Sequence, residues 1–326
     1  MRIGIYVYGN LGKAVEKAVK QNPDIKITAI FTRRDPKTIK TETPGVKVCT
    51  IYDILRYKNK IDVMIICAGS ATDLPNMTPS LAKDFNVLDS FDTHTDIKTH
   101  FAKVDGFAKT YGNVALISAG WDPGMFSLAR LYASCILPES KTYTFWGKGV
   151  SQGHSEAVRN VYGVEDARQY TVPKEDILEK VRSGECPNLT AEEMHRRECF
   201  VVAREDYNKK EIATTIENMP NYFAGYETDI EFISSEKMAL EHSKLPHGGT
   251  VITNGKTGLQ NENKAQIEYS LKLDSNPEFT GNVLLAYARA LYKMSQRGEF
   301  GCKTVFDVAP ADLSPLSPQE LREKLL

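Results

Sequence analysis

The alternation of apolar and polar positions at the start of the chain predicts a strand, a glycine turn and a helix. Residues 2–8 are apolar enough for a buried strand, and Gly9 to Gly12 lead into a pattern in which Leu11 and Val15 recur at helical spacing. The first N–H groups of such a helix can bind an anion, and a dinucleotide pyrophosphate is the anion favoured here. A tight turn without a ligand is the alternative, because the fuller fingerprint G-x-G-x-x-G would have glycine in place of Val7.

Two arginines follow the next predicted strand. This strand covers residues 25–31, and it ends close to where a Rossmann fold places the residue that contacts the adenosine ribose. Arg33 and Arg34 stand there instead of an acidic residue, and planar guanidinium groups suit a phosphate. The pair therefore favours NADP over NAD, unless it is only a solvated loop.

Apolar runs alternate with amphipathic segments through the first third of the chain. This alternation predicts a parallel doubly wound sheet, an α/β fold of the Rossmann type. The candidate elements cover residues 46–49, 52–57, 62–67, 74–85, 86–88, 94–111 and 114–117.

Small and polar residues follow three of these strands, at 68–73, 90–94 and 118–125. Ligands of open α/β sheets bind beyond the carboxyl ends of the strands, so these segments are expected to line one rim. Asp92 and Asp122 could hold an ammonium group or take a proton there. Alternatively, Asp122 before Pro123 could cap a helix, Asp92 could cap the helix beginning near residue 93, and Trp121 could be a core aromatic.

After about residue 125, the regular alternation of short apolar runs and amphipathic segments ends. A crossing helix at 126–137 is followed by strand candidates at 141–146, 169–172, 197–203, 227–233, 250–254 and 264–274, with intervening helices at 155–161, 174–182, 209–218 and 236–242. This composition predicts an α+β domain with a mixed sheet. Asn276-Pro277 is expected to end the last strand, and residues 281–296 form a periodic helix. The expected domains are 1–120 for the dinucleotide, 121–275 for substrate and dimerisation, and 276–326 as a helix and tail returning to the first domain.

A glycine-rich stretch at 145–154 surrounds Trp146. Its backbone N–H groups could hold a carboxylate, with Trp146 as an apolar wall, or it could be a hairpin-like loop around a buried aromatic. His154 at a helix start could be a cap, a solvated residue or a ligand.

Net charge, the lengths of apolar runs and cysteine spacing limit the kinds of function expected of this chain. The 326 residues carry a net charge of −1, which gives no general electrostatic reason to bind nucleic acid or a membrane. No signal peptide or span-length apolar run is recognised, so a cytoplasmic protein is expected. The six cysteines show no metal-binding spacing and are interpreted as reduced core thiols, and no metal is expected.

Taken together, these segments resemble the meso-diaminopimelate D-dehydrogenase family from one end of the chain to the other. The matching segments are YGNLG, FTRR, GSATD, SFDTH, GWDPGMFS, FWGKGVSQGHS, QYTVP, HRRECFVVA, MPNYFAGYE, PHGGTVITNGKTG and LKLDSNPEFT. The resemblance implies an NADP-dependent homodimer that reversibly deaminates the D-centre of meso-2,6-diaminopimelate to L-2-amino-6-oxopimelate, which cyclises to tetrahydrodipicolinate in lysine biosynthesis. Val7 departs from the family fingerprint.

The resemblance also implies two sets of site residues. The expected cofactor contacts are Gly9, Asn10, Leu11, Thr32, Arg33, Arg34, Gly69, Ser70, Ala71, Thr72, Ser90, Phe91, Asp92, Gly120, Trp121, Asp122 and Pro123. The expected substrate contacts are Asp92, Asp122, Trp146, Gln152, Gly153, Thr171, Arg197, His247 and Asn276, with Asp92 or Asp122 at the reacting amine. A diamino diacid needs acidic residues, an arginine fork and neutral hydrogen-bonding groups, which are the types present.

Several alternatives stay open at this point. Arg197 could be a surface ion-pair residue, His247 could belong to a turn, Asn276 could simply end a strand, and Thr171 could be there for its β-propensity. A related imine reductase, a dehydrogenase for other D-amino acids and a non-catalytic NADP-binding regulator are the competing functions.

Overall fold

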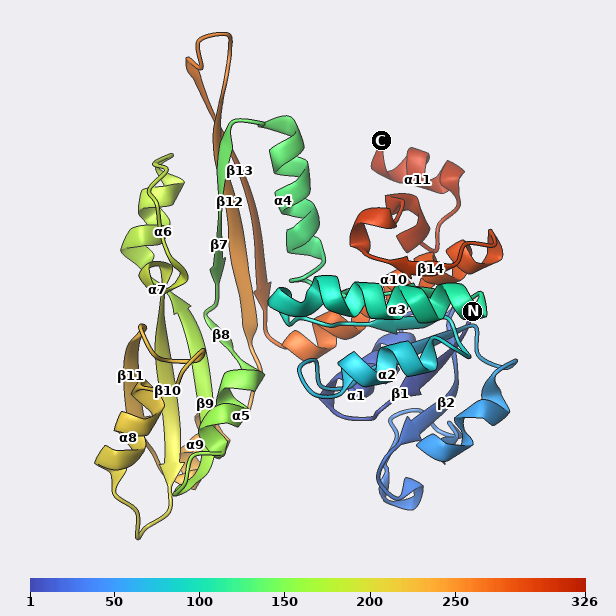
Figure 1. The fold of residues 1–326 in the computed structure, drawn as a ribbon, viewed down its shortest axis with the longest axis horizontal. Coiled ribbons are helices and arrows are strands. Elements are labelled where there is room, and N and C mark those ends of the chain that lie inside the picture. Colours follow the sequence, from blue (N-terminus) through green and yellow to red (C-terminus); the bar gives the residue numbers. More distant parts are fainter. The chain divides into compact units, whose positions relative to one another are not determined.

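The computed structural model describes residues 1–326, which divide into two compact units. The first comprises Met1–Leu128 and Pro277–Leu326, and the second comprises Ala129–Asn276. Figure 1 colours the chain by sequence: the first unit runs from blue to teal and again from orange to red, and the second unit lies between, from green to orange. Helix α4 (Met125–Ile136) contains the first boundary.

A seven-stranded sheet forms the centre of the first unit, with the order β14-β6-β5-β4-β1-β2-β3. All its strand pairs are parallel. The strands are β1 (Arg2–Tyr6), β2 (Lys26–Thr32), β3 (Val48–Thr50), β4 (Val63–Ile66), β5 (Val87–Asp89), β6 (Val114–Leu116) and β14 (Gly301–Lys303). The doubly wound α/β prediction is confirmed, and the chain order reverses beside β1, where such sheets bind dinucleotides.

Helices cover both faces of this sheet. One core joins β1 and β4 to α1 (Asn10–Val19) and α10 (Asn276–Gln296) through residues such as Val15 and Leu284. The other core joins the opposite face to α2 (Leu74–Leu81) and α3 (Ile97–Tyr111) through Leu74 and Val104. The short elements of the unit are η1 (Pro36–Thr38), η2 (Ile51–Tyr57), η3 (His94–Asp96), η4 (Val305–Asp307), η5 (Pro310–Leu313) and α11 (Pro318–Leu325).

The second unit contains two sheets rather than one (Figure 1). A mixed sheet has the order β11-β10-β9-β8, and an antiparallel sheet has the order β13-β12-β7. Their strands are β7 (Ser140–Trp146), β8 (Gly149–Val150), β9 (Val164–Pro173), β10 (His195–Ala203), β11 (Glu227–Phe232), β12 (His247–Thr257) and β13 (Asn263–Leu273).

Each of these sheets has its own apolar core. Helices α5 (Gln152–Arg159) and α8 (Lys209–Glu217) pack on the mixed sheet through Val158, Ile212 and Ile216, which are almost fully buried. Helix α6 (Glu175–Arg182) packs on the antiparallel sheet through Leu178 and Val181. Helices α7 (Ala191–Met194) and α9 (Ser235–Glu241) complete the unit.

Two details differ from the sequence expectations. Asn276-Pro277 begins α10 instead of ending β13, because proline suits the first turn of a helix, where its missing N–H is not needed. All six cysteines are free, but Cys135 and Cys186 are exposed, so the core interpretation is wrong for these two. None of the helices combines the length and apolar character needed to cross a bilayer.

Candidate functional site

The turn after β1 is tight although Val7 stands where the dinucleotide fingerprint has a glycine. Val7 has a φ of 71°, in the left-handed region, and its N–H donates to the Phe31 carbonyl at 2.9 Å. A Cβ at Gly12 would lie 2.7 Å from the Val7 carbonyl oxygen, so the helix approaches the strand exit too closely for a side chain. The strand therefore leads into the helix through a tight turn although Val7 is not a glycine.

The N-terminus of α1 provides donors that fit an anion. Gly9 is the N-cap residue and makes no side-chain capping bond, and the first turn contains no acidic residue. Gly9 and Asn10 are exposed, and the first N–H groups of a helix have no partner within it. A pyrophosphate suits this position because the N–H groups and the helix dipole both attract negative charge.

Arg33 and Arg34 lie at the end of β2, and each has a defined partner. Two guanidinium nitrogens of Arg33 contact the two carboxylate oxygens of Asp73 at 3.0 and 3.2 Å. Arg34 donates to the Tyr8 carbonyl at 2.6 Å, and its backbone N–H donates to the Thr32 hydroxyl at 3.1 Å. Arg34 is therefore held beside the turn that leads into α1, and Arg33 is held by the loop after β4, while both residues remain exposed to solvent.

The loop after β4 connects this region to the rim after β5. Asp73, which sequence reasoning missed, closes the loop by accepting the Gly69 N–H at 3.3 Å. The Ser70 hydroxyl accepts the backbone N–H of Asp92 at 2.8 Å and contacts the Thr93 hydroxyl at 3.3 Å. The structure thus brings the predicted cofactor residues of 69–72 and 90–92 together, while Ala71 and Thr72 face solvent.

Neither Asp92 nor Asp122 is the N-cap residue of a helix, although capping was the alternative role for each. Thr93 is the N-cap residue of η3, and α3 begins only at Ile97, so Asp92 is exposed on the rim. Helix α4 begins at Met125, which leaves Asp122 in the preceding turn. Asp92 is not a cap because α3 begins later than the expected start near residue 93, and Asp122 is not a cap because α4 begins at Met125, next to the start that periodicity predicted at residue 126.

The turn that contains Asp122 is closed by glycine and by an aromatic contact. A Cβ at Gly124 would collide with the Gly120 carbonyl at 1.8 Å, and Gly124 has a φ of 130°. Trp121 is 8% exposed and meets Phe126 edge to face at 5.3 Å, so its ring belongs to the core of this turn.

Arg197 is the centre of the polar site in the second unit. It is 7% exposed, and one of its terminal nitrogens donates to the Thr171 hydroxyl at 2.6 Å, as expected for cross-strand partners on β10 and β9. Its guanidinium carbon lies 3.9 Å from the centre of the Tyr226 ring. The surface ion-pair alternative is therefore wrong, because the guanidinium group is buried and stacked, without a carboxylate on it.

His195, which sequence reasoning missed, contacts both the backbone and the ring of Trp146. It is 1% exposed, its Nδ1 contacts the Ala191 carbonyl at 3.0 Å, and its Nε2 accepts the Trp146 backbone N–H at 2.9 Å. The two rings stack at 5.4 Å. Burial lowers the pKa of His195 to about 4, opposed by the Ala191 carbonyl and assisted by the nearby Arg197 charge, so the ring is neutral at pH 7.

The glycine-rich loop fits against His247. A Cβ at Gly149 would lie 2.4 Å from the His247 ring, so only glycine allows this approach. His247 begins β12, and its Nδ1 accepts the Gly248 N–H at 2.8 Å. The glycine-rich stretch and His247 are therefore in direct contact, and His247 is not part of an isolated turn.

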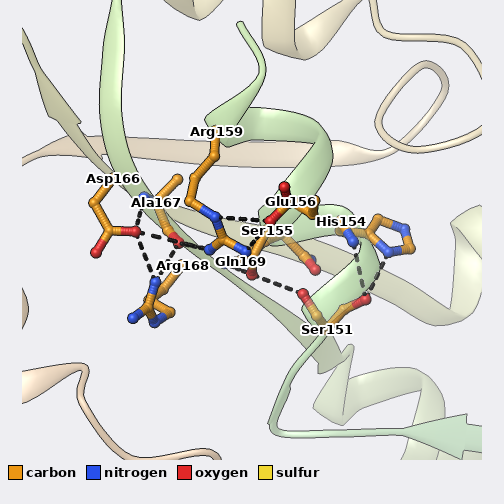
Figure 2. A network of polar contacts seen from close by, with 9 residues as sticks. All are labelled: Ser151, His154, Ser155, Glu156, Arg159, Asp166, Ala167, Arg168 and Gln169. Atoms are coloured by element: carbon orange, nitrogen blue, oxygen red, sulfur yellow. Dashed lines mark hydrogen bonds and ion pairs between the residues drawn. The ribbon is translucent and has the colours of Figure 1, made fainter. Parts of the chain in front are cut away.

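Figure 2 shows the network that joins the first turn of α5 to β9. Ser151 is the N-cap residue, and its hydroxyl contacts His154 Nδ1 at 2.6 Å. Ser155 accepts the Gln169 backbone N–H at 2.9 Å, which fixes the helix to the sheet. His154 is thus neither a cap nor solvated. Burial, assisted by the Arg197 charge, lowers its pKa to about 4.

Two further predicted residues begin helices. Gln152 and Gly153 are exposed in the first turn of α5. Asn276 begins α10, and its backbone N–H donates to the Leu245 carbonyl at 2.9 Å.

Comparison with known proteins places this chain in a family. A family model described as the diaminopimelic acid dehydrogenase C-terminal domain matches residues 120–275. Meso-diaminopimelate D-dehydrogenase of Acetivibrio thermocellus is 56% identical over the whole chain and 98% of that protein. The chain belongs to the meso-diaminopimelate D-dehydrogenase family. Its homologue from Corynebacterium glutamicum is 45% identical over 98% of each chain.

Two solved structures superpose closely on this chain. The C. glutamicum enzyme in complex with DAP superposes with a TM-score of 0.93 at 44% identity, over 100% of this chain and 99% of that one. An engineered D-amino acid dehydrogenase bound to NADP+ superposes with a TM-score of 0.90 at 43% identity, with the same coverage.

Proposed function

We propose that this protein is an NADP-dependent meso-diaminopimelate D-dehydrogenase. It is an oxidoreductase that converts the D-centre of meso-2,6-diaminopimelate and water to L-2-amino-6-oxopimelate and ammonia, reversibly, with NADP as the oxidant. The product cyclises to tetrahydrodipicolinate, which serves lysine biosynthesis. The observation that carries the proposal is the 56% identity to a meso-diaminopimelate D-dehydrogenase along the entire chain.

The first unit is proposed to bind NADP. The free N–H groups of Gly9, Asn10 and Leu11 would hold the pyrophosphate, and the guanidinium groups of Arg33 and Arg34 would hold the adenosine phosphate. NADP supplies the hydride acceptor of the reaction. The remaining proposed contacts come from Thr32 and from the loops that follow three strands, namely Gly69 to Thr72, Ser90 to Asp92 and Gly120 to Pro123.

The second unit is proposed to bind the distal, non-reacting end of the substrate. The buried guanidinium of Arg197, the Thr171 hydroxyl and His247 would hold one carboxylate, since a stacked arginine fork without a carboxylate partner is suited to an acid group. Trp146 would form an apolar wall. Gln152, Gly153 and Asn276 supply neutral hydrogen-bonding groups.

The protein's own part in the chemistry is positioning and proton handling. Asp92 or Asp122 is proposed to contact the reacting ammonium, which must lose a proton before its carbon gives up hydride. Loss of hydride leaves an imine, and water then hydrolyses it to the ketone and ammonia. A carboxylate that is ion-paired to the ammonium has a lowered pKa and is a weak base, so a water molecule can carry the proton away.

One experiment tests this function directly. The purified protein is mixed with NADP and, separately, with meso-, LL- and DD-diaminopimelate and with D-alanine, and NADPH absorbance is followed. We expect activity with the meso isomer that exceeds activity with LL-diaminopimelate and D-alanine. Higher activity with D-alanine would instead favour a dehydrogenase for simple D-amino acids, and no NADPH with any substrate would refute the proposal.

A cytoplasmic homodimer is also proposed. Leu131, Tyr132 and Ile136 are 40%, 54% and 65% exposed on α4, and large apolar side chains exposed near one another can mark an interface. A second copy of the chain would cover these residues. Light scattering of the wild type and of Tyr132→Asp/Ile136→Asp tests this: the wild type should have the mass of a dimer and the variant that of a monomer.

A further inference from the structure

Asp89, at the end of β5, is a buried carboxylate that the proposed chemistry does not use. It is 0% exposed, and both of its oxygens have two partners. Oδ1 accepts the backbone N–H groups of Phe91 at 3.1 Å and Ser118 at 2.9 Å. Oδ2 accepts the Thr78 hydroxyl at 2.7 Å and contacts His100 Nε2 at 2.8 Å. A carboxylate satisfied in this way cannot reach a substrate.

The two backbone hydrogen bonds to the Asp89 side chain lie at the carboxyl ends of β5 and β6, just beyond the last residues through which these strands pair. Strands β5 and β6 are paired only through Val87 with Ala115 and Leu88 with Leu116. Beyond this point the Asp89 carbonyl accepts the Ala119 N–H at 3.0 Å, and the Asp89 side chain joins the two outgoing segments. The side chain therefore adds to this backbone bond and joins the starts of both rim loops. One loop reaches Asp92 one residue after Phe91, and the other reaches Asp122 four residues after Ser118.

The backbone at Ser118 indicates that this bond restrains a strained conformation. Ser118 has a φ of 57°, in the left-handed region that residues other than glycine adopt only at a cost in free energy. Such conformations persist where surrounding contacts enforce them, and they concentrate at functional sites. Here the enforcing contact is the bond from the Ser118 N–H to Asp89.

His100, on helix α3, contacts the loop that follows β5. Its ring is 4% exposed and stacks on the Phe91 ring with centres 4.2 Å apart and planes 22° apart. The same ring contacts Asp89 through Nε2. Helix α3 thus supports the loop after β5 through a polar and an aromatic contact made by one residue.

We propose that Asp89, supported by His100, is a positioning residue that sets the spacing of the two rim loops carrying Asp92 and Asp122. It acts through the backbone N–H groups of Phe91 and Ser118 and touches neither substrate nor cofactor. The kinetic consequence rests on the proposed function, whereas the structural consequence for the loops does not.

The test is Asp89→Asn, which is nearly isosteric. Its amide oxygen can accept the two backbone bonds, but its amide nitrogen replaces the oxygen that accepts from Thr78 and contacts His100, so the carboxyl charge and the fit of the group are lost. We expect kcat with meso-diaminopimelate to fall by at least about tenfold, because small misplacements of reacting groups are costly, while KM for NADP stays within roughly twofold. Hydrogen exchange at residues 90–93 and 118–124 should become faster.

Asp24→Asn is the matched control. Asp24 also accepts charged hydrogen bonds, from Arg289 at 2.6 and 2.8 Å, but it precedes β2 and so lies at the amino ends of the strands, away from the rim. We expect this variant to lose stability but to keep kcat and the exchange of both rim segments. A folded Asp89→Asn protein with wild-type kcat and wild-type exchange would overturn the inference, as would equal losses of kcat in the two variants.

A second variant covers the case in which Asp89→Asn does not fold. His100→Gln leaves the bonds from Phe91 and Ser118 to Asp89 and removes the imidazole ring, with its stacking on Phe91 and its Nε2 contact to Asp89. We expect a smaller fall in kcat and faster exchange mainly at 90–93, and unchanged exchange there would contradict the role of His100. Should the wild type form no NADPH from meso-diaminopimelate, the proposed function fails, and hydrogen exchange alone still decides whether Asp89 fixes the loops.

Discussion

Replacement of Arg197 by alanine tests the proposed carboxylate clamp most directly. The guanidinium of Arg197 is buried, donates to Thr171 at 2.6 Å and stacks on Tyr226 at 3.9 Å, so its orientation is already fixed. The Arg197→Ala variant would lose up to two charge-assisted hydrogen bonds to the substrate, each about 1.5–3 kcal/mol before compensation by water. We expect a loss of roughly 2–4 kcal/mol in kcat/KM for meso-diaminopimelate, about 30- to 700-fold at about 1.4 kcal/mol per decade.

The stability of the same variant should behave differently from its activity. Burial lowers the pKa of Arg197, with Tyr226 and Glu192 acting in the opposite direction, because the buried guanidinium has lost much of its contact with water. In the variant, relief of the cost of burying this charge offsets the lost packing on Tyr226 and the lost hydrogen bond to Thr171. The variant should therefore unfold at about the same urea concentration as the wild type although it is much less active.

The assay compares two substrates and two neighbouring arginines. NADPH formation is measured with meso-diaminopimelate and with D-alanine, which lacks the distal carboxylate, so the loss should be smaller for D-alanine. Arg196→Ala is the control: Arg196 is the next residue on β10 and pairs with Glu198 and Asp229 at 2.6 and 2.8 Å, away from Thr171. Near-normal kcat/KM of Arg197→Ala with meso-diaminopimelate, or equal losses for both substrates, would refute the clamp.

Three further predictions follow from the geometry of the two units. Replacing Arg33 and Arg34 by neutral residues should weaken NADP binding at least about tenfold and leave NAD binding nearly unchanged in fluorescence titrations; equal losses would argue against phosphate recognition. Gly12→Ala should weaken both cofactors together, since its Cβ would lie 2.7 Å from a backbone oxygen, and unaltered binding would show that the turn can relax. Because the pKa values of His154 and His195 are lowered to about 4, the native state binds fewer protons than the unfolded state below pH 6.5. Stability in urea should fall as pH decreases from 6.5 to 4, by up to roughly 3 kcal/mol per histidine, and His195→Gln should reduce this slope.

Periodicity predicted the first unit well because the strands of a parallel sheet are short apolar runs separated by amphipathic helices. Strands β1, β2, β4 and β6 were expected within two residues of their observed ends. Strand β14 was not expected, since three residues at Gly301–Lys303 are too few to show a period, and only the open edge of β6 makes them a strand.

The second unit was harder to predict because strand runs do not indicate which strands pair. The sequence contained most of the strands, but a single mixed sheet was expected where there are two. The start of α10 was missed for a local reason. Asn276-Pro277 is compatible with the end of a strand and with the first turn of a helix, and the packed helix that follows selects the second.

The residues that sequence reasoning missed share one property: each acts through a partner that is distant in sequence. His195 supports Trp146 from 49 positions away, Asp73 holds Arg33 from 40 positions away, and Asp89 fixes Ser118 from 29 positions away. A residue at a strand end can be recognised as a site candidate because topology alone places it on the rim. The residue that orients it has no such signal, since a buried histidine or aspartate in an apolar run is defined only by the group it contacts. Sequence patterns can therefore indicate which groups reach a ligand, and the packed structure is needed to identify the groups that hold them in position.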